Sequence, residues 1–148
     1  MSKLSHKLVR ALQDAEPERT VTVTIEPGLM MDGDPAMVAV VMQNLSNNAW
    51  KYTSKTVQAQ LEIGRETGDD GATNVFVKDN GAGFDMTHAS KLFEAFQRLH
   101  QDSEFTGTGI GLANVKRVVE RHVGRVWAQA SPGQGAVFRF TLEAPPSA

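Results

Sequence analysis

The feature that most constrains the fold is a glycine-rich run that opens directly into a helix-like segment. Glycine occupies every second position of residues 107–111, and the apolar residues from Ile110 onward recur at helical spacing. Such a run brings backbone N–H groups close to a phosphate and points the positive end of a helix at it. Glycine-rich turns before helices are common, so the run indicates a phosphate site only together with other motifs.

Composition and charge narrow the class of protein. The 148 residues suit one domain with a single core, and 41% of them are hydrophobic, which is enough to fold. The net charge of −2 gives no electrostatic reason to expect nucleic acid or an anionic membrane as a partner. The absence of cysteine excludes disulfides and thiolate chemistry and fits a reducing cytoplasm. No apolar run approaches the roughly 20 residues that span a bilayer, and residues 1–8 lack the apolar core of a signal peptide.

The order of predicted elements indicates an α/β domain. Apolar spacing predicts a helix around 4–12, a strand at 21–25, a helix from 35 to about 51, strands at 57–63 and 74–79, a helix at 110–122, and a hairpin of 124–130 with 136–142. Asp34 and Pro35 suit the start of the second helix. Residues 86–106 have no long period, so we expect a mobile lid with a short helix at 91–96. These elements predict a two-layer sandwich, in which helices cover one face of a mixed, mostly antiparallel sheet.

The two ends of the chain differ from its middle. Leu4, Leu8 and Leu12 share one face of a helix that starts at the beginning of the sequence, and Pro17 ends it. We therefore expect residues 1–15 to be the end of a longer helical element or a linker, residues 16–143 to be the main domain, and residues 144–148 to be a frayed tail.

Polar residues share one face of the helix predicted at 35–51. Asn44, Asn48 and Lys51 are spaced i, i+4 and i+7, at the margin of its apolar face. An amide oxygen suits Mg²⁺, so Asn48 is a candidate metal ligand, and Lys51 is a candidate for neutralising phosphate charge. A solvated amphipathic helix gives the same pattern and, for this motif alone, is the commoner explanation.

Asp79 ends the strand predicted at 74–79 and precedes two glycines, Gly81 and Gly83. A carboxylate there can accept a hydrogen bond from the exocyclic amine of adenine, and the glycines leave room for a flat base. An Asp-Asn-Gly turn is also a common hairpin signal. Residues 84–87 do not alternate as a partner strand should, which disfavours a hairpin at this point.

The segment between the two glycine motifs contains candidate lid residues. Phe93 and Phe96 can anchor a lid, or they can belong to the core. Gln97 and Arg98 can reach a terminal phosphate when the lid closes, because a guanidinium fork suits phosphate. The glycine run then supplies N–H groups and the hydroxyl of Thr108 as further donors; a flexible loop before a helix is its alternative explanation.

These four motifs, in this order, resemble the N, G1, F and G2 boxes of the catalytic ATP-binding domain of bacterial sensor histidine kinases. That domain has the Bergerat fold, which is shared in outline with gyrase and heat-shock chaperone ATPases. The resemblance covers roughly residues 20–142. Residues 96–100, with Glu104 and Phe105 before the glycines, resemble kinases that carry phytochrome-like or PAS-type sensors.

The resemblance implies a site for ATP and Mg²⁺. It gives Asn44, Lys51 and Arg98 catalytic roles at the phosphates, Asn48 the metal, and Asp79 the adenine. The residues expected to contact the nucleotide are Asn44, Asn48, Lys51, Tyr52, Asp79, Gly81, Gly83, Phe93, Phe96, Gln97, Arg98, Gly107, Thr108, Gly109, Ile110, Gly111 and Leu112.

Two positions refine this expectation. Hydrolytic relatives tend to carry a glutamate where this chain has Asn44, and an amide is not a general base at neutral pH, so the site suits phosphoryl transfer better than rapid hydrolysis. Kinases of this class phosphorylate a histidine on a separate dimerisation hairpin. His6 imitates the start of that motif, but Lys7 stands where an acid is normal. We therefore expect residues 1–15 to end the hairpin rather than to carry the acceptor.

The resulting expectation is phosphoryl transfer from Mg²⁺-ATP to a histidine of a separate dimerisation domain, with a response regulator as an indirect partner. We expect a cytoplasmic domain, monomeric in isolation, without nucleic-acid binding or membrane insertion. The alternatives are an anti-sigma-factor-type serine kinase, against which the helix at 4–12 argues, and a non-catalytic nucleotide-binding module. Arg98 and the second glycine box argue against that module.

Overall fold

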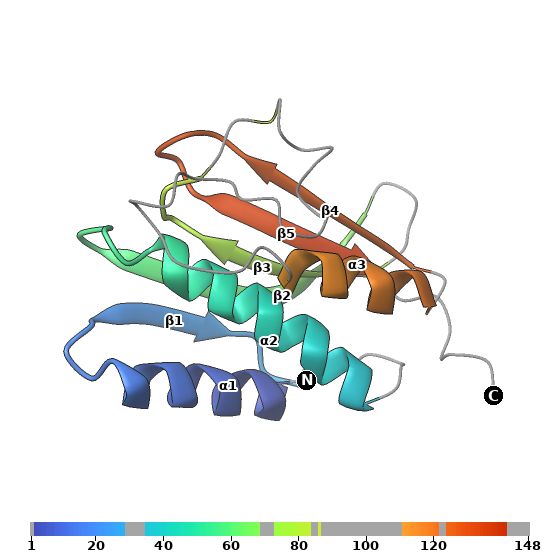
Figure 1. Cartoon of the computed structure of the whole chain (residues 1–148), viewed down its shortest axis with the longest axis horizontal. Coiled ribbons are helices and arrows are strands. Elements are labelled where there is room, and N and C mark those ends of the chain that lie inside the picture. Colours follow the sequence, from blue (N-terminus) through green and yellow to red (C-terminus); the bar gives the residue numbers. More distant parts are fainter. Residues whose placement is uncertain are drawn as a thin grey trace.

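The computed structural model describes residues 2–28, 35–68, 73–83, 86, 111–121 and 124–141. Within these residues three helices and five strands follow one another along the chain (Figure 1). Their order is α1 (Ser2–Ala15), β1 (Val21–Ile25), α2 (Pro35–Tyr52), β2 (Ala59–Thr67), β3 (Thr73–Asp79), α3 (Gly111–Arg121), β4 (Arg125–Ala130) and β5 (Ala136–Thr141).

The five strands form one mixed sheet in the order β1-β2-β3-β5-β4. β1 and β2 pair in parallel, and α2 makes the crossover between them. The other three pairs are antiparallel, and in their register Ile63 lies opposite Val77, which lies opposite Phe138. The predicted mixed, mostly antiparallel sheet and both predicted hairpins are therefore confirmed.

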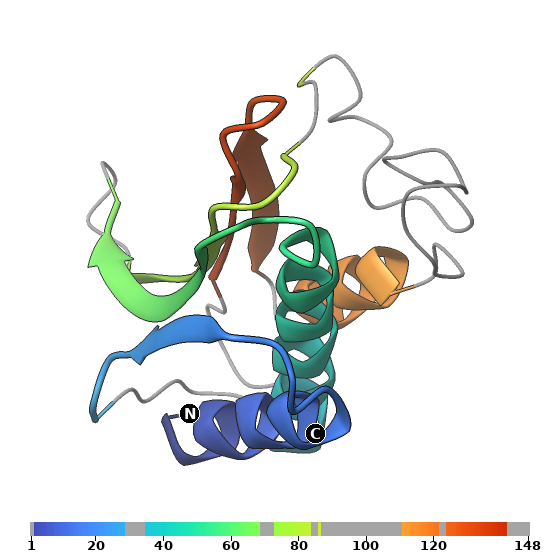
Figure 2. The ribbon, with the colours of Figure 1, turned by 90° about the vertical axis from the view of Figure 1, so that its left-hand side faces the viewer.

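The helices cover one face of the sheet, which gives the predicted two layers (Figure 2). Strand residues alternate between the faces, so every second side chain of β2, β3 and β5 meets α2 and α3. The buried apolar core consists of Val38, Val41, Met42, Leu45, Ala49, Leu61, Ile63, Val75, Val77, Val115, Val119, Ala128, Ala136, Phe138 and Phe140.

α1 lies beside β1 and α2 (Figure 1). Its residues Leu4, Leu8 and Val9 pack against the core, and His6 is exposed on its surface. The helix ends at Ala15, two residues before Pro17, as the sequence predicts. Within the described parts of the chain, no helix combines the length and the apolar character needed to cross a membrane.

The main difference from the predicted strands lies at both ends of β2. The second strand is predicted at 57–63, but β2 runs from Ala59 to Thr67, and Val57 lies in a turn with 96% of its surface exposed. β3 ends at Asp79, opposite Leu61, so no strand in the described part of the chain lies beside Val57. The alternation of apolar residues begins at Val57, two residues before the first residue of β2 that pairs with another strand. The expected lid at 86–106 lies outside the described residues except for Met86, which is exposed. The capping Asp34 and the ends of the predicted helix at 110 and 122 also lie outside them.

Candidate functional site

The C-terminal half of α2 carries the predicted metal and phosphate residues. Asn44, Asn48 and Lys51 are half-buried, whereas Leu45 and Ala49 are buried in the core. Helical spacing therefore places the polar residues at the margin of the apolar face, as predicted. Side chains in this position remain accessible while the core fixes the helix that carries them.

Two of the polar side chains on α2 have defined neighbours. Asn44 Nδ2 donates back along the helix to Val40 O at 2.9 Å. Lys51 Nζ lies 4.9 Å from the centre of the Tyr52 ring, in a cation–π contact. Lys51 also lies in the last turn of α2, where the negative end of the helix dipole favours a positive charge. This end of α2 thus carries the amide of Asn44 and the ammonium group of Lys51. An amide is not a general base at neutral pH, and a charged ammonium group has no lone pair to accept a proton.

Asp79 is the last residue of β3, and its side chain is only 5% exposed. Its Oδ1 accepts a hydrogen bond from Gly81 N at 2.8 Å. Burial raises the pKa of Asp79 to about 6, although the backbone N–H groups of Gly81 and Ala136 oppose the rise. A buried carboxylate with a raised pKa at the end of a strand is a physical signal of a functional site.

The loop at 80–83 is fixed by backbone hydrogen bonds on two sides. Ala82 N donates to Tyr52 O, at the end of α2, at 3.0 Å. Ala82 O accepts from Gly133 N, in the turn between β4 and β5, at 2.7 Å. The loop that follows Asp79 therefore bridges the end of a helix and the turn of a hairpin.

Close packing explains both glycines of this loop. A Cβ at Gly81 would overlap Tyr52 O. Gly83 has a φ of +63°, and a Cβ there would overlap Ser131 O. The chain therefore needs glycine here for backbone approach and conformation. The sequence predicts only that these glycines leave room for a flat base. Their close contacts with Tyr52 O and Ser131 O are a second reason for glycine at both positions.

The start of α3 is the described part of the second glycine box. Gly111 begins the helix, and Leu112 packs, half-buried, against the core. α3 lies beside α2 on the same face of the sheet (Figure 1). The other predicted residues of the lid and the box lie outside the described residues: Phe93, Phe96, Gln97, Arg98, Gly107, Thr108, Gly109 and Ile110.

Sequence reasoning missed Asn80, which extends the pairing of β2 beyond the end of β3. Its Nδ2 donates to Gln58 O, and its Oδ1 accepts from Gln60 N, each at 2.8 Å. The two partners are 22 and 20 residues away in the sequence, so no local pattern predicts this pairing. Asn80 thus fixes the start of the loop that carries Gly81 and Gly83.

Among the cavities of the described part of the chain, two lie in clearly different places. One of about 320 Å³ is bordered by Tyr52, Gly81, Ala82 and Gly133, so it lies beside the loop at 80–83. A larger one of about 480 Å³ is lined by Trp127 and other residues of the opposite face of the sheet. The described lining of the larger cavity includes none of the predicted nucleotide residues, so size alone does not identify the site.

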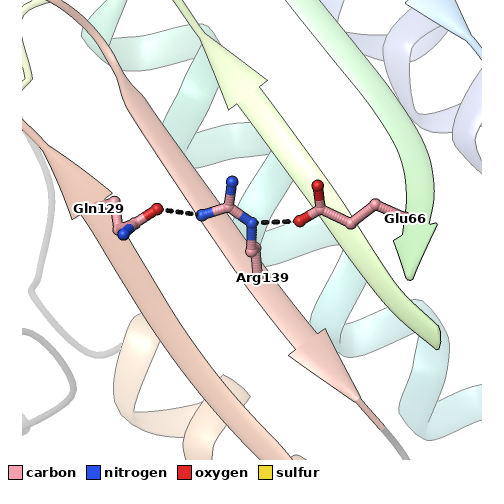
Figure 3. Close-up of polar contacts among 3 residues, drawn as sticks. All are labelled: Glu66, Gln129 and Arg139. Atoms are coloured by element: carbon pink, nitrogen blue, oxygen red, sulfur yellow. Dashed lines mark hydrogen bonds and ion pairs between the residues drawn. The ribbon is translucent and has the colours of Figure 1, made fainter. Parts of the chain in front are cut away.

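The larger cavity is bordered by side chains that already bind one another (Figure 3). Arg139 on β5 contacts Glu66 on β2 through its Nε, and its Nη1 donates to Gln129 on β4 at 2.5 Å. The guanidinium group of Arg139 thus binds a carboxylate on one side and an amide on the other, and links the strands. These contacts explain it as a structural group. The candidate site therefore remains the region of α2, Asp79, the loop at 80–83 and the start of α3.

A comparison with protein families decides the class of this site. The family of histidine kinase-, DNA gyrase B- and HSP90-like ATPases matches residues 33–146, which is well over half of the chain. The chain belongs to this family. The match spans α2, Asp79, the loop at 80–83 and α3, so these elements belong to its ATP-binding domain.

Relatives of this ATPase domain include a phytochrome and a sensory kinase. The domain is 34% identical over 142 residues to Cyanobacterial phytochrome A from Nostoc sp. (strain PCC 7120), an alignment that covers 96% of the chain and 18% of the relative. It is 31% identical over 147 residues to the adaptive-response sensory kinase SasA of Crocosphaera subtropica, covering 96% of the chain and 37% of the relative. The chain thus spans well under half the length of these relatives.

Solved structures agree with the fold. The mycobacterial sensor histidine kinase MprB superposes with a TM-score of 0.77 at 22% identity, covering 99% of this chain and 97% of that one. Full-length ShkA in complex with AMPPNP gives 0.74 at 24% identity, covering 99% of this chain and 31% of that one. These likenesses show the fold. The family match and the sensory-kinase relatives show that this is an ATP-binding catalytic domain of the histidine kinase type.

Proposed function

We propose that this chain holds Mg²⁺-ATP and presents the γ-phosphate to a histidine on a separate dimerisation hairpin. The observation that carries the proposal is the buried carboxylate of Asp79, which lies beside a loop fixed against α2. A hydrogen bond from the exocyclic amine of adenine would give this carboxylate a partner in a place where water is largely excluded. Adenine recognition then sets the position of the phosphates along α2.

The phosphate end of the proposed site lies along α2. Asn48 would give an amide oxygen to Mg²⁺, and Lys51 would place its charge near the phosphates. The half-buried position of both side chains supports these roles, because each is fixed by the helix yet accessible. When bound, Mg²⁺ supplies charge neutralisation on the phosphate oxygens. Asn44 would border the phosphates without activating water.

The remaining residues are assigned by position in the family's boxes. Tyr52 would flank the nucleotide, with Gly81 and Gly83 beside the base. We propose that the lid and the second glycine box close over the phosphates through Phe93, Phe96, Gln97, Arg98, Gly107, Thr108, Gly109, Ile110, Gly111 and Leu112. Arg98 would approach the γ-phosphate, where a guanidinium stabilises the charge of the transferring group.

We also propose how the chain fits into a longer kinase. Residues 1–15 would be the end of the dimerisation hairpin or its linker, residues 16–143 the catalytic domain, and residues 144–148 a tail. The packing of α1 against the core supports a helix that joins the two domains. The isolated domain would be monomeric and work in the cytoplasm, and a response regulator would receive the phosphate after the histidine.

Transfer in trans tests this proposal. The chain is mixed with the dimerisation hairpin of the same kinase and γ-labelled ATP, with or without Mg²⁺. We expect acid-labile, base-stable label on the hairpin, dependent on Mg²⁺, and none on this chain alone. Asn48→Ala should remove the Mg²⁺ dependence of ATP binding while metal-free ADP binding is kept.

Other results would redirect the assignment. Acid-stable label on a serine of a partner would identify a serine kinase of the anti-sigma-factor type. ATP binding without transfer to any hairpin would indicate a non-catalytic nucleotide module. Label on His6 of this chain alone would contradict the assignment of residues 1–15.

A further inference from the structure

The end of α2 is held by two hydrogen bonds from distant parts of the sequence. The last carbonyl groups of an α-helix have no partner within the helix. Trp50 O accepts from Arg19 Nη1 at 2.7 Å, and Tyr52 O accepts from Ala82 N at 3.0 Å. Arg19 follows α1, and Ala82 follows β3. Segments from both sides of α2 in the sequence therefore close on the same helical turn.

Arg19 makes several contacts at once in this position. Its guanidinium lies 4.5 Å from the centre of the Trp50 ring, and its Nη2 donates to Thr53 Oγ1 at 3.0 Å. A planar guanidinium can stack on an indole while it donates to two acceptors, which an ammonium cannot do. Its charge is also favoured at the C-terminus of a helix. Arg19 is thus a specific anchor for the last turn of α2.

The same anchor is tied back to α1. Trp50 Nε1 donates to Glu16 Oε1 at 3.1 Å. Gln13, on the last turn of α1, donates through Nε2 to Arg19 O at 2.7 Å and to Glu16 O at 3.1 Å. One side chain of α1 therefore fixes the turn that carries both Glu16 and Arg19. Because α1 packs on the core, its position and that of Arg19 are linked.

From the end of α2 the contacts continue to Asp79. The loop that bonds to Tyr52 O through Ala82 also contains Gly81, whose N donates to Asp79 Oδ1 at 2.8 Å. Gly81 leaves no space against Tyr52 O, so the loop and the helix end must move together. A shift of the last turn of α2 therefore reaches the Asp79 carboxylate through two hydrogen bonds.

We propose that Arg19 is a positioning residue of the nucleotide site. It holds the last turn of α2 against the loop at 80–83, so that a displacement of α1 loosens the side of the site that binds adenine. That the ligand of the site is a nucleotide rests on the proposed function. That α1 acts on the site through the last turn of α2 rests on the contacts of Arg19, Trp50 and Ala82.

Arg19→Gln tests the proposal, because it removes the stacked guanidinium and keeps a polar side chain. Arg65→Gln is the matched control: Arg65 Nε pairs with Glu26 Oε2 at 2.9 Å, half exposed and outside the route. Two quantities are measured well below the unfolding temperatures of all variants. They are the amide exchange rate of Ala82 without nucleotide and the affinity for Mg²⁺-ADP by calorimetry.

We expect Arg19→Gln to speed exchange at Ala82 and to weaken Mg²⁺-ADP binding by about fivefold or more, the lower end of typical coupling between sites. Arg65→Gln should change neither quantity. Arg19→Lys, which keeps the charge and loses the fork, should fall between wild type and Arg19→Gln, and it serves as the test if Arg19→Gln does not fold.

A lower unfolding temperature with unchanged exchange and affinity would make Arg19 purely structural and overturn the proposal. A wild-type chain that binds no Mg²⁺-ADP would instead reject the proposed function. In that case exchange at Ala82 still decides whether Arg19 controls the loop, since that measurement needs no nucleotide.

Discussion

A carboxylate on each face of the sheet has a different environment: one is buried, and the other is partly exposed and paired with a cation. On the face covered by helices, Asp79 is 5% exposed, binds a backbone N–H, and has its pKa raised to about 6 by burial. On the open face, the Glu66 side chain is 39% exposed and pairs with Arg139. Among the described residues no cation pairs with Asp79, so its carboxylate can accept a further hydrogen bond, whereas Glu66 already has a cationic partner. The difference separates a candidate for function from a surface ion pair.

The largest expected contrast between the faces is in stability. Phe140 on β5 is completely buried against the helices, so Phe140→Ala should lower the free energy of unfolding by about 3–5 kcal/mol. Val137 lies on the open face of the same strand and is half-buried, so Val137→Ala should cost about 1 kcal/mol or less. Urea denaturation of both variants measures the difference. Equal losses would mean that the open face is covered by something that buries Val137.

The second contrast concerns ligand binding. Asp79→Asn should weaken ATP and ADP alike by about 1.5–3 kcal/mol, the range for a hydrogen bond to a charged group. It should leave stability at pH 7 unchanged or higher, because it removes a charge whose burial is unfavourable. Calorimetric titration and thermal unfolding test both parts. Unchanged ADP affinity in a folded variant would remove Asp79 from the adenine site.

The raised pKa of Asp79 adds a pH signature to this second contrast. The folded chain holds the Asp79 proton more tightly than the unfolded chain, since its pKa is about 6 instead of 3.8. Between these values, lowering the pH therefore adds stability through this group. Adenosine affinity should move the other way and fall as the pH drops through 6, because the protonated acid accepts poorly. Asp79→Asn should show neither trend.

Sequence reasoning recovered both layers because each follows from local periodicity. Alternation predicted β1 and the hairpin of β4 and β5, a short apolar run predicted β3, and helical spacing put Asn48 and Lys51 at the margin of α2. Their placement needed no knowledge of distant residues. Both predicted ends of β2 were wrong: apolar alternation at Val57 continues past the point where a neighbouring strand ends, whereas pairing with β3 continues to Thr67, beyond the last alternating apolar residue.

The contacts that fix the site could not be predicted in the same way. Arg19 stands between Glu18 and Thr20 and looks like a solvated charge, yet it bonds to Trp50, which is 31 residues away. Nothing in the sequence around Ala82 predicts the hydrogen bond from its backbone N to Tyr52 O. Such contacts depend on how α1, α2 and the hairpin turn meet in space. They involve backbone atoms, which residue types do not specify.

The third contrast is between two glycines with positive φ. Gly135 has φ +82°, and a Cβ there would overlap Asp79 O, whereas Gly28 has φ +71° and open space around it. Gly28→Ala should therefore cost only the conformational strain, about 1 kcal/mol. Gly135→Ala should cost more, on the order of 1–3 kcal/mol, and should also weaken ADP binding because it displaces Asp79. If Gly28→Ala weakened ADP equally, the contact with Asp79 would not be the cause.

The smallest expected effect is on the open face. Arg139→Gln removes the ion pair with Glu66 and the hydrogen bond to Gln129 (Figure 3). Glu66 is more than a third exposed, so solvent screens the pair and the loss should stay within about 1 kcal/mol. Denaturant unfolding at low and high salt measures it. The loss should shrink at high salt, because surface ion pairs are screened.

ADP binding should not respond to Arg139→Gln, because Arg139 points away from the helix-covered face that carries Asp79. Arg139 and Asp79 lie on neighbouring strands of one sheet, since Asp79 on β3 lies opposite Ala136 on β5. The variant therefore tests whether the two faces act independently at close range. A change in ADP affinity would mean that the two faces communicate through β5. The helix-covered face would then not be sufficient to define the site.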